Sequence, residues 1–391
     1  MSDGGGLWRV GGVRQGPGVA EPFLVVGPDG VVVEVARAWV RDLVVGDRSD
    51  RTVRAYCFAL LTWFRVLWRA NIAWDRATEH ETAAMVGWYR SAANPQRRRA
   101  CAATQAGSVN LKTGKPSLGL GYAPATINLT LAAVHSFYAF YAYRGEGPVV
   151  NPVPASAQRR RALMHRSPLA EPPRFRRGPY RQKSLSTVPR SIPDHQWDEL
   201  MAVLTCDRDR ALFEAFVSTG ARAAEMLGVC SEDLDWAAQR MWVVSKGSRV
   251  RRVVPLSPVA LQWLGCYLGS VGMPAAPTSI WRARRGEQRS LTYAATRRVM
   301  QRANEVIATN WSLHDLRHTA AARMVGSGVL TIAEVQVILG HADLRSTTRY
   351  TMPRVEDVCA KLQDYYRSPA SVTPRMPVEY DPADVAVIFG G

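Results

Sequence analysis

Apolar residues recur at the spacing of an α-helix over much of the N-terminal part of the chain. In Arg51–Ala70 they return every three or four positions, which predicts an amphipathic helix with Asp50 as its N-cap. The same spacing predicts helices over Glu81–Ala92 and over a segment that opens at Pro124. We expect the aromatic residues of this last segment to pack in a core rather than to stack on bases. Its predicted apolar side comprises Leu129, Leu131, Val134, Phe137 and Phe140.

Helical periodicity returns after residue 190, where caps and glycines mark several element ends. Asp194 is expected to cap the first of these helices. The helices predicted in this part are Asp194–Leu204, Arg208–Thr219, Thr292–Ala308, Leu313–Val325, Ile332–Leu339 and Val355–Tyr366.

Two places carry short β-type runs around turn residues instead. Met241–Ser245 and Arg249–Pro255 flank a Lys-Gly-Ser turn, which predicts a hairpin. Phe23–Val26 and Val31–Val33 flank a Gly-Pro-Asp-Gly turn, which predicts a second, smaller hairpin. Together these patterns predict a mainly α protein with a small antiparallel β-sheet.

Composition suggests five parts along the chain. A leader (1–35) precedes a helical unit (36–150), a basic, proline-containing linker (151–190), a second unit (191–366) and a tail (367–391). The linker contains ten arginines and lysines against one acidic residue. Such a run is either a solvated segment or a linker that follows a nucleic-acid backbone, since Arg and Lys bind phosphates without reading sequence.

The net charge indicates what kind of partner the protein binds. Fifty basic residues against 33 acidic ones give a formal charge of +17, which predicts a polyanion as the partner and most simply nucleic acid. A ribosome-associated or membrane-surface protein is the alternative. The basic residues that we expect to contact DNA phosphates are Arg97, Arg98, Arg99, Lys112, Lys115, Arg159, Arg160, Arg161, Arg176 and Arg177.

The six cysteines are scattered, and none forms a Cys-x-x-Cys pair. Their spacing suits neither a zinc ribbon nor a disulfide framework, so reduced thiols are the expectation. The N-terminus has no apolar segment of a signal peptide, and no run is long enough to cross a bilayer. We therefore expect a soluble cytoplasmic protein without a membrane partner.

Four short motifs carry residues suited to chemistry. Arg222 and Glu225 are three positions apart, which predicts a shared helix face, and His314-x-x-Arg317 repeats that spacing. His341 follows a glycine that ends a predicted helix, and Tyr350 lies nine residues further on. Each motif alone has an ordinary structural explanation: a surface ion pair, a capping residue or a core tyrosine.

A histidine pair also raises the question of a metal. His314 and His318 have the spacing of two zinc ligands, but the Glu that follows the first His in zinc proteases is replaced by Asp315, and no third ligand is indicated. We expect no metal at this place.

Taken in order, Arg222, Lys246, His314, Arg317, His341 and Tyr350 resemble the motif of the tyrosine recombinase, or phage integrase, family. The resemblance covers about 190–366 and is closest in Thr219–Asp235, His314–Gly328 and Val337–Met352. The helical unit 36–150 is similar to the family's core-binding domain by pattern more than by motif.

The resemblance implies a role for each residue. Arg222 and Arg317 match the catalytic arginines, Lys246 the catalytic lysine, and His314 the first residue of the His-x-x-Arg pair. His341 matches a position held by His or Trp, and Tyr350 matches the nucleophile. Glu225 matches an acidic residue that supports the first arginine, and His318 is expected to be a buttress.

In relatives a glycine often precedes the lysine. Here a serine does, and Arg249, Arg251 and Arg252 lie close by in the sequence.

The family's architecture implies a two-domain clamp around double-stranded DNA and a homotetramer on two DNA sites, with accessory proteins as further possible partners and no cofactor. We expect an integrase or transposase of a mobile element, with the resolution of replicon dimers as an open alternative. The leader is short for the separate arm-binding domain of some phage integrases, which favours a simpler recombinase or a transposon-borne one. Two rival readings stay open. One is a type IB topoisomerase, which relaxes supercoils as a monomer, and the other is a catalytically silent DNA-binding protein.

Overall fold

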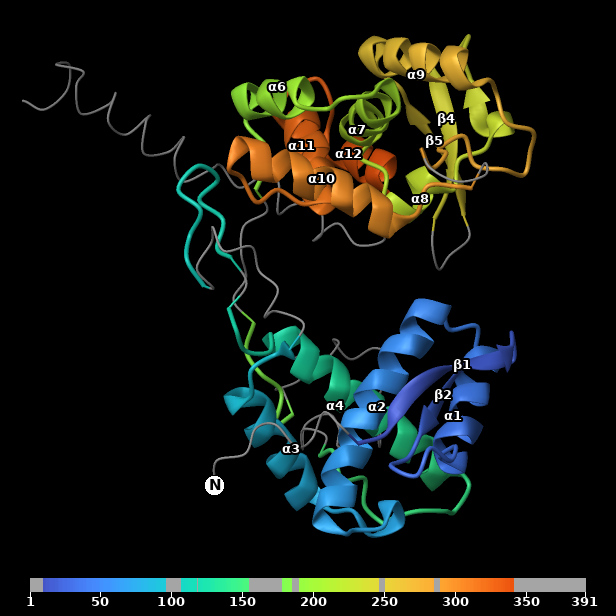
Figure 1. Cartoon of the computed structure of the whole chain (residues 1–391), viewed down its shortest axis with the longest axis vertical. Helices are drawn as coiled ribbons and strands as arrows, with labels where there is room; N and C mark the ends of the chain where they lie inside the picture. The colour runs from blue at the N-terminus through green and yellow to red at the C-terminus, as the bar shows by residue number, and fades with distance from the viewer. Residues whose placement is uncertain are drawn as a thin grey trace, which may run out of the picture. The chain divides into compact units, whose positions relative to one another are not determined.

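The computed structural model describes residues 10–95, 107–117, 119–154, 178–184, 190–245, 250–284 and 289–340. They divide into two compact units (Figure 1). The first comprises the described residues up to 184 together with Ala308–Asn310, and the second comprises the rest. Both are mostly helical, and each contains one small antiparallel sheet, so the predicted fold class is confirmed.

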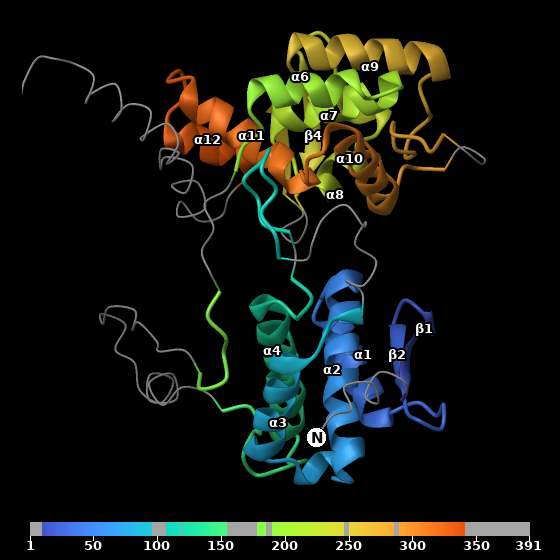
Figure 2. The ribbon, with the colours of Figure 1, turned by 60° about the vertical axis from the view of Figure 1, so that its left-hand side comes forward.

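The first unit is a group of helices beside a two-stranded sheet. Strands β1 (Gly12–Gly18) and β2 (Glu21–Val26) pair antiparallel, and helix α1 (Glu34–Val45) follows. The long helices α2 (Asp50–Ala70) and α4 (Pro124–Tyr143) lie side by side (Figure 2), and α3 (Glu79–Ser91) packs against α2. A 3₁₀ turn, η2 (Trp74–Arg76), joins α2 to α3.

Aromatic side chains fill the core of this unit. Trp39, Trp63 and Phe137 are almost completely buried, and the Trp63 indole donates a 3.0 Å hydrogen bond to the Tyr138 hydroxyl. Phe137 and Phe140 are core residues, as the sequence predicts, whereas Tyr143 at the end of α4 is exposed. Leu129 is an exception to the predicted apolar side, because 40% of it is exposed.

The N-terminal strands belong to the first unit. The expected Gly-Pro-Asp-Gly turn is present, but Val31–Val33 supplies only a single bridge, at Val32. The main partner of β2 is β1, a Gly- and Pro-containing strand that alternation does not reveal. Arg65 of α2 is buried and donates to the carbonyls of Val10 (2.6 Å) and Gly11 (3.1 Å), which fastens the start of β1 to the helix.

The described ends of the predicted linker also pack on the first unit. The Thr82 hydroxyl donates to the carbonyl of Pro152 at 2.9 Å, and the Tyr180 hydroxyl donates to Glu79 at the same distance. Val153 is buried in the core of the unit. The boundaries at 150 and 190 remain predictions.

In the second unit, the helices α7 (Asp207–Thr219) and α9 (Pro258–Val271) pack on each other. The short β3 (Leu234–Asp235) pairs with β4 (Arg240–Val244), which pairs with β5 (Arg251–Pro255), all antiparallel. The remaining helices labelled in Figure 1 are α6 (Asp194–Ala202), α8 (Ala223–Leu227), α10 (Tyr293–Ile307), α11 (Leu313–Gly326) and α12 (Ile332–Leu339). A 3₁₀ turn, η4 (Ser231–Asp233), precedes β3.

Two caps differ from the expectation. Ser49 rather than Asp50 is the N-cap of α2, and its hydroxyl accepts from the Thr52 amide. Asp194 is the first residue of α6, whose N-cap is Pro193. An acidic residue in a first helical turn still favours the helix, because it faces the positive end of the helix dipole.

Candidate active site

A turn between α7 and α8 positions the first predicted arginine. Gly220 ends α7 in the left-handed region (φ 61°), and a Cβ there would lie 2.5 Å from the Leu339 side chain, so both the backbone angle and the space require glycine. Arg222 has extended backbone angles and is the N-cap of α8. The expectation that Arg222 and Glu225 share a helix face is therefore wrong: Glu225 closes a capping box with the residue that precedes the helix.

Glu225 is a buried carboxylate surrounded by donors. It accepts from the backbone N–H of Arg222 at 2.9 Å, from Arg222 Nη1 at 2.8 Å and from Arg252 Nη2 at 2.7 Å. Burial alone raises the pKa of Glu225, but the hydrogen bonds and positive charges of Arg222 and Arg252 outweigh it and hold this pKa below its ordinary value. The carboxylate is thus ionised, and it orients the Arg222 guanidinium.

The second predicted arginine lies on α11. Ser312 and Asp315 form a capping box at the start of this helix, with Asp315 accepting from the Ser312 amide and hydroxyl at 2.7 Å. Arg317 is 3% exposed, and it donates to the carbonyls of Gly220 (2.6 Å) and Leu339 (2.9 Å). One guanidinium therefore connects the end of α7 with the end of α12.

His314 and His318 lie one turn apart on α11, where His314 is exposed and His318 is half-buried. Their rings are in edge-to-face contact, with centroids 4.3 Å apart. The role of His318 as a buttress stays a prediction. Among the described residues, no group of three or more His, Cys, Asp or Glu could hold a metal ion.

Three arginines from separate parts of the chain bind carbonyls at the C-terminal end of α12. Arg252 of β5 donates to the carbonyl of Ile338, and Arg317 of α11 donates to that of Leu339. Arg222 donates to the carbonyl of Gly340 at 3.3 Å. The carbonyls at a helix C-terminus lack intrahelical donors and carry the negative end of the dipole, so they suit cationic partners. The structure thus brings Arg222, Glu225 and Arg317 together.

Sequence reasoning missed the third member of this group. Arg252 lies opposite Val243 in the sheet register, on the face that carries the buried Met241 and Val254. A signal was available: within the strand Arg251–Pro255, alternation from the apolar Val254 assigns Arg252 to the inner face.

The other predicted catalytic residues, Lys246, His341 and Tyr350, lie outside the described residues, and so does the predicted helix Val355–Tyr366. The same holds for most of the predicted DNA contacts, namely Arg97, Arg98, Arg99, Arg159, Arg160, Arg161, Arg176 and Arg177.

Lys112 and Lys115 are described. Lys112 is exposed in a turn of the first unit, and Lys115 is half-buried, with its carbonyl accepting from Asn310 at 3.0 Å.

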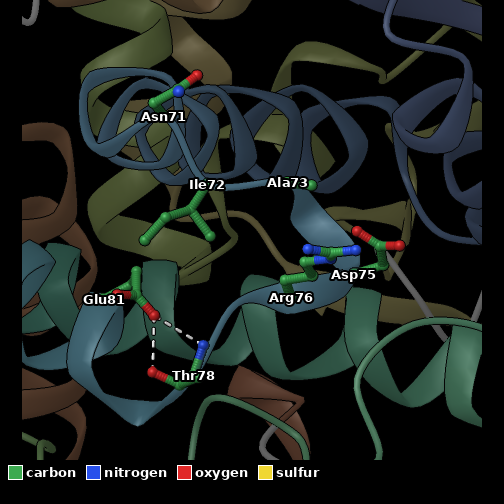
Figure 3. A pocket seen from close by; sticks show the side chains of 7 residues that line it. All are labelled: Asn71, Ile72, Ala73, Asp75, Arg76, Thr78 and Glu81. Atoms are coloured by element: carbon green, nitrogen blue, oxygen red, sulfur yellow. Dashed lines mark hydrogen bonds between the residues drawn. The ribbon is translucent and has the colours of Figure 1, made fainter.

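A separate pocket lies in the first unit, where α2 ends and α3 begins (Figure 3). Its lining includes Asn71, the left-handed C-cap of α2, together with Asp75 and Arg76. Glu81 points to the backbone N–H and hydroxyl of Thr78, so its carboxylate is used in the cap of α3. Two acidic residues against one arginine do not favour a phosphate at this pocket.

Comparison with known proteins places the second unit in a family. Residues 190–356 match the model of the phage integrase family. This part of the chain belongs to that family. The matched residues 190–356 include Arg222, Arg317 and the C-terminal end of α12. A tyrosine recombinase XerC of Pelobacter propionicus is 33% identical over 166 residues, which is 41% of this chain and 54% of the relative.

Solved structures agree on the fold. A XerH site-specific recombinase bound to palindromic difH substrate has a TM-score of 0.56 at 14% identity, covering 85% of each chain. The Tn1549 transposon integrase in complex with a circular intermediate DNA has a TM-score of 0.55 at 11% identity, covering 85% of this chain and 99% of that one. The chain spans about half the length of the curated relatives it matches first. None of the helices in the described ranges is long and apolar enough to cross a membrane.

Proposed function

We propose that this protein is a site-specific DNA recombinase that cleaves and rejoins strands through a 3′-phosphotyrosyl bond to Tyr350. The observation that carries the proposal is the convergence of Arg222 and Arg317, from distant positions in the sequence, on the end of α12. His341 is the next residue after Gly340, and Tyr350 follows nine residues later. Membership of residues 190–356 in the phage integrase family supports the same assignment.

In the proposed reaction, the Tyr350 hydroxyl attacks the scissile phosphorus and the bond to the 5′ oxygen breaks. His314 takes the phenolic proton, and Lys246 gives a proton to the departing 5′ oxygen. Negative charge grows on the two non-bridging oxygens as the phosphorane forms. Arg222 and Arg317 stabilise that charge, because guanidinium groups stay protonated and bind such oxygens in pairs.

His341 donates a further hydrogen bond to the phosphate. The 5′ hydroxyl of a partner strand then attacks the phosphotyrosyl bond and restores Tyr350. The bond energy is conserved, so the reaction needs no ATP, and the two arginines supply the positive charge that a metal ion would otherwise provide.

The substrate in this proposal is duplex DNA, and its strands are exchanged within a homotetramer on two sites. Lys112 and the arginines near residue 98 and in the linker would contact phosphates without reading bases. We infer further that the reaction serves integration or transposition of a mobile element. We expect the enzyme to act in the cytoplasm, because its proposed DNA substrate is found there.

Covalent trapping tests this proposal. Wild type and Tyr350→Phe are incubated with fragmented DNA from the source of the protein, the mixture is denatured with SDS, and the DNA that stays attached to protein is sequenced. Attachment only with wild type is the expected result. No attachment on DNA shown to be bound would indicate a silent binder, while attachment by Tyr350→Phe would identify another nucleophile. Relaxed plasmids without recombinant product would instead indicate a topoisomerase.

A further inference from the structure

Arg252 occupies an unusual position for a cation. It is the charged residue on a sheet face whose neighbours Met241, Val243 and Val254 are at most 1% exposed. Its own side chain is 11% exposed. A buried charge is costly unless strong partners compensate it, so its retention at a core-facing position needs an explanation.

The partners of Arg252 are two parts of the candidate active site. Nη2 donates to Glu225 Oε2 at 2.7 Å, and Nη1 donates to the carbonyl of Ile338. Gly340 packs directly on the guanidinium: a Cβ there would lie 2.8 Å from Nε of Arg252. Arg252 therefore contacts the carboxylate that orients Arg222 and the helix end that precedes His341.

Arg251, the preceding residue, has different partners. Arg251 faces the outer side of the sheet, where it donates to Asp233 at 2.9 Å and lies over the Trp242 ring. Neither of these partners belongs to the α12 end. Arg251 and Arg252 can therefore be compared directly, because they lie on the same strand and carry the same charge but bind different partners.

We infer that Arg252 is a positioning residue for strand cleavage, a role that rests on the proposed function. It shares Glu225 with Arg222, with one carboxylate oxygen bound to each guanidinium. It also fixes the last carbonyls of α12, so that Arg222 and the segment leading to His341 keep one relative position. Arg252 is not the proton donor, since its guanidinium faces protein acceptors and stays protonated.

The experiment compares Arg252→Met, Arg252→Lys and Arg251→Met with wild type at DNA concentrations that saturate binding. A positioning loss of this kind costs roughly tenfold to a hundredfold in cleavage rate. We expect that loss for Arg252→Met with DNA affinity nearly unchanged, a smaller loss for Arg252→Lys, and the wild-type rate for Arg251→Met. If the methionine variant does not fold, the lysine variant keeps the comparison, because it retains the charge but reaches fewer acceptors.

A second substrate separates positioning of Arg222 from a general loss of structure. In a methylphosphonate, an uncharged methyl group replaces one non-bridging oxygen, so less charge has to be stabilised by arginines. The defect of Arg252→Met should shrink on this substrate, as should that of Arg222→Ala. Cleavage by Arg252→Met at the wild-type rate, or an equal defect on both substrates, would overturn the inference. Absence of covalent DNA with wild type and Arg251→Met would instead be a failure of the proposed function.

Discussion

Replacing Glu225 with glutamine should destabilise the second unit at neutral pH. The carboxylate side chain is completely buried, and it binds two guanidinium groups and one backbone N–H. Glutamine has the same shape but no charge. If its oxygen keeps the Arg252 bond and the backbone bond, its amide N–H₂ faces the Arg222 guanidinium, donor against donor.

The magnitude follows from the exposure of each partner. Arg252 is 11% exposed, and a buried hydrogen bond between charged groups contributes about 1.5–3 kcal/mol. Arg222 is 42% exposed, so solvent screens its pair with Glu225, which contributes about 0–1 kcal/mol. Because the Arg252 bond loses its charge assistance but is kept, and the Arg222 pair is lost, the expected loss for Glu225→Gln is about 2 kcal/mol of the free energy of unfolding.

The loss should also depend on pH in one direction. The folded-state pKa of Glu225 lies below its ordinary value of 4.5, so its contribution is complete above the unfolded pKa. It disappears as the pH falls through the lowered folded-state pKa. The difference between wild type and Glu225→Gln should consequently shrink in acid.

Urea unfolding of the full chain, followed by tryptophan fluorescence and circular dichroism at several pH values, measures this difference. Glu305→Gln is the matched control, since Glu305 is exposed on α10 and its loss should change stability by less than about 0.5 kcal/mol. The reasoning would be refuted by a Glu225→Gln deficit that stays constant or grows as the pH falls, or by one no larger than that of the control.

Three further results are expected. Gly340→Ala should lower the melting temperature and slow covalent trapping, because φ is 63° and the new Cβ meets Arg252; the equivalent change at the exposed Gly265 should do neither. Arg65→Met should destabilise the first unit by about 1–3 kcal/mol and speed proteolysis of β1, since two carbonyls lose a charged donor. The logarithm of the DNA-binding constant should fall steeply and linearly with that of salt concentration; a flat dependence would exclude binding through phosphates.

The sequence predicts most of the long helices, because their apolar faces repeat clearly. It did not predict α9, although Ser257 and Pro258 form a good start: the Ser257 hydroxyl accepts from the Ala260 amide, and proline is at the first turn. Two interior glycines and a nearly uniform apolar composition hide the periodicity of this helix. Such a helix is recognised only once its packing against α7 is known.

The candidate site shows a similar division. Arg222, Glu225 and Arg317 were identified by spacing and resemblance, and the structure brings them together. Their geometry was not predictable: Arg222 precedes α8 rather than lying on it, because Glu225 pairs with its backbone as well as its side chain. The role of Arg252 depends on a contact between residues 86 positions apart, which no local pattern contains.

The α12 carbonyls explain how such a site remains ready for an anion. Three guanidinium groups held close together repel one another. The C-terminal end of α12 carries a partial negative charge of only about half an elementary charge, so it offsets part of this repulsion. A phosphodiester carries a full charge and more exposed acceptor oxygens, so it is the stronger partner for the half-exposed Arg222. Glu225 neutralises part of this charge, because one of its oxygens binds Arg222 and the other binds Arg252. In the proposed reaction Arg222 is thus oriented in advance, and the Gly340 carbonyl that it binds at 3.3 Å is a weak enough partner for a phosphate to replace.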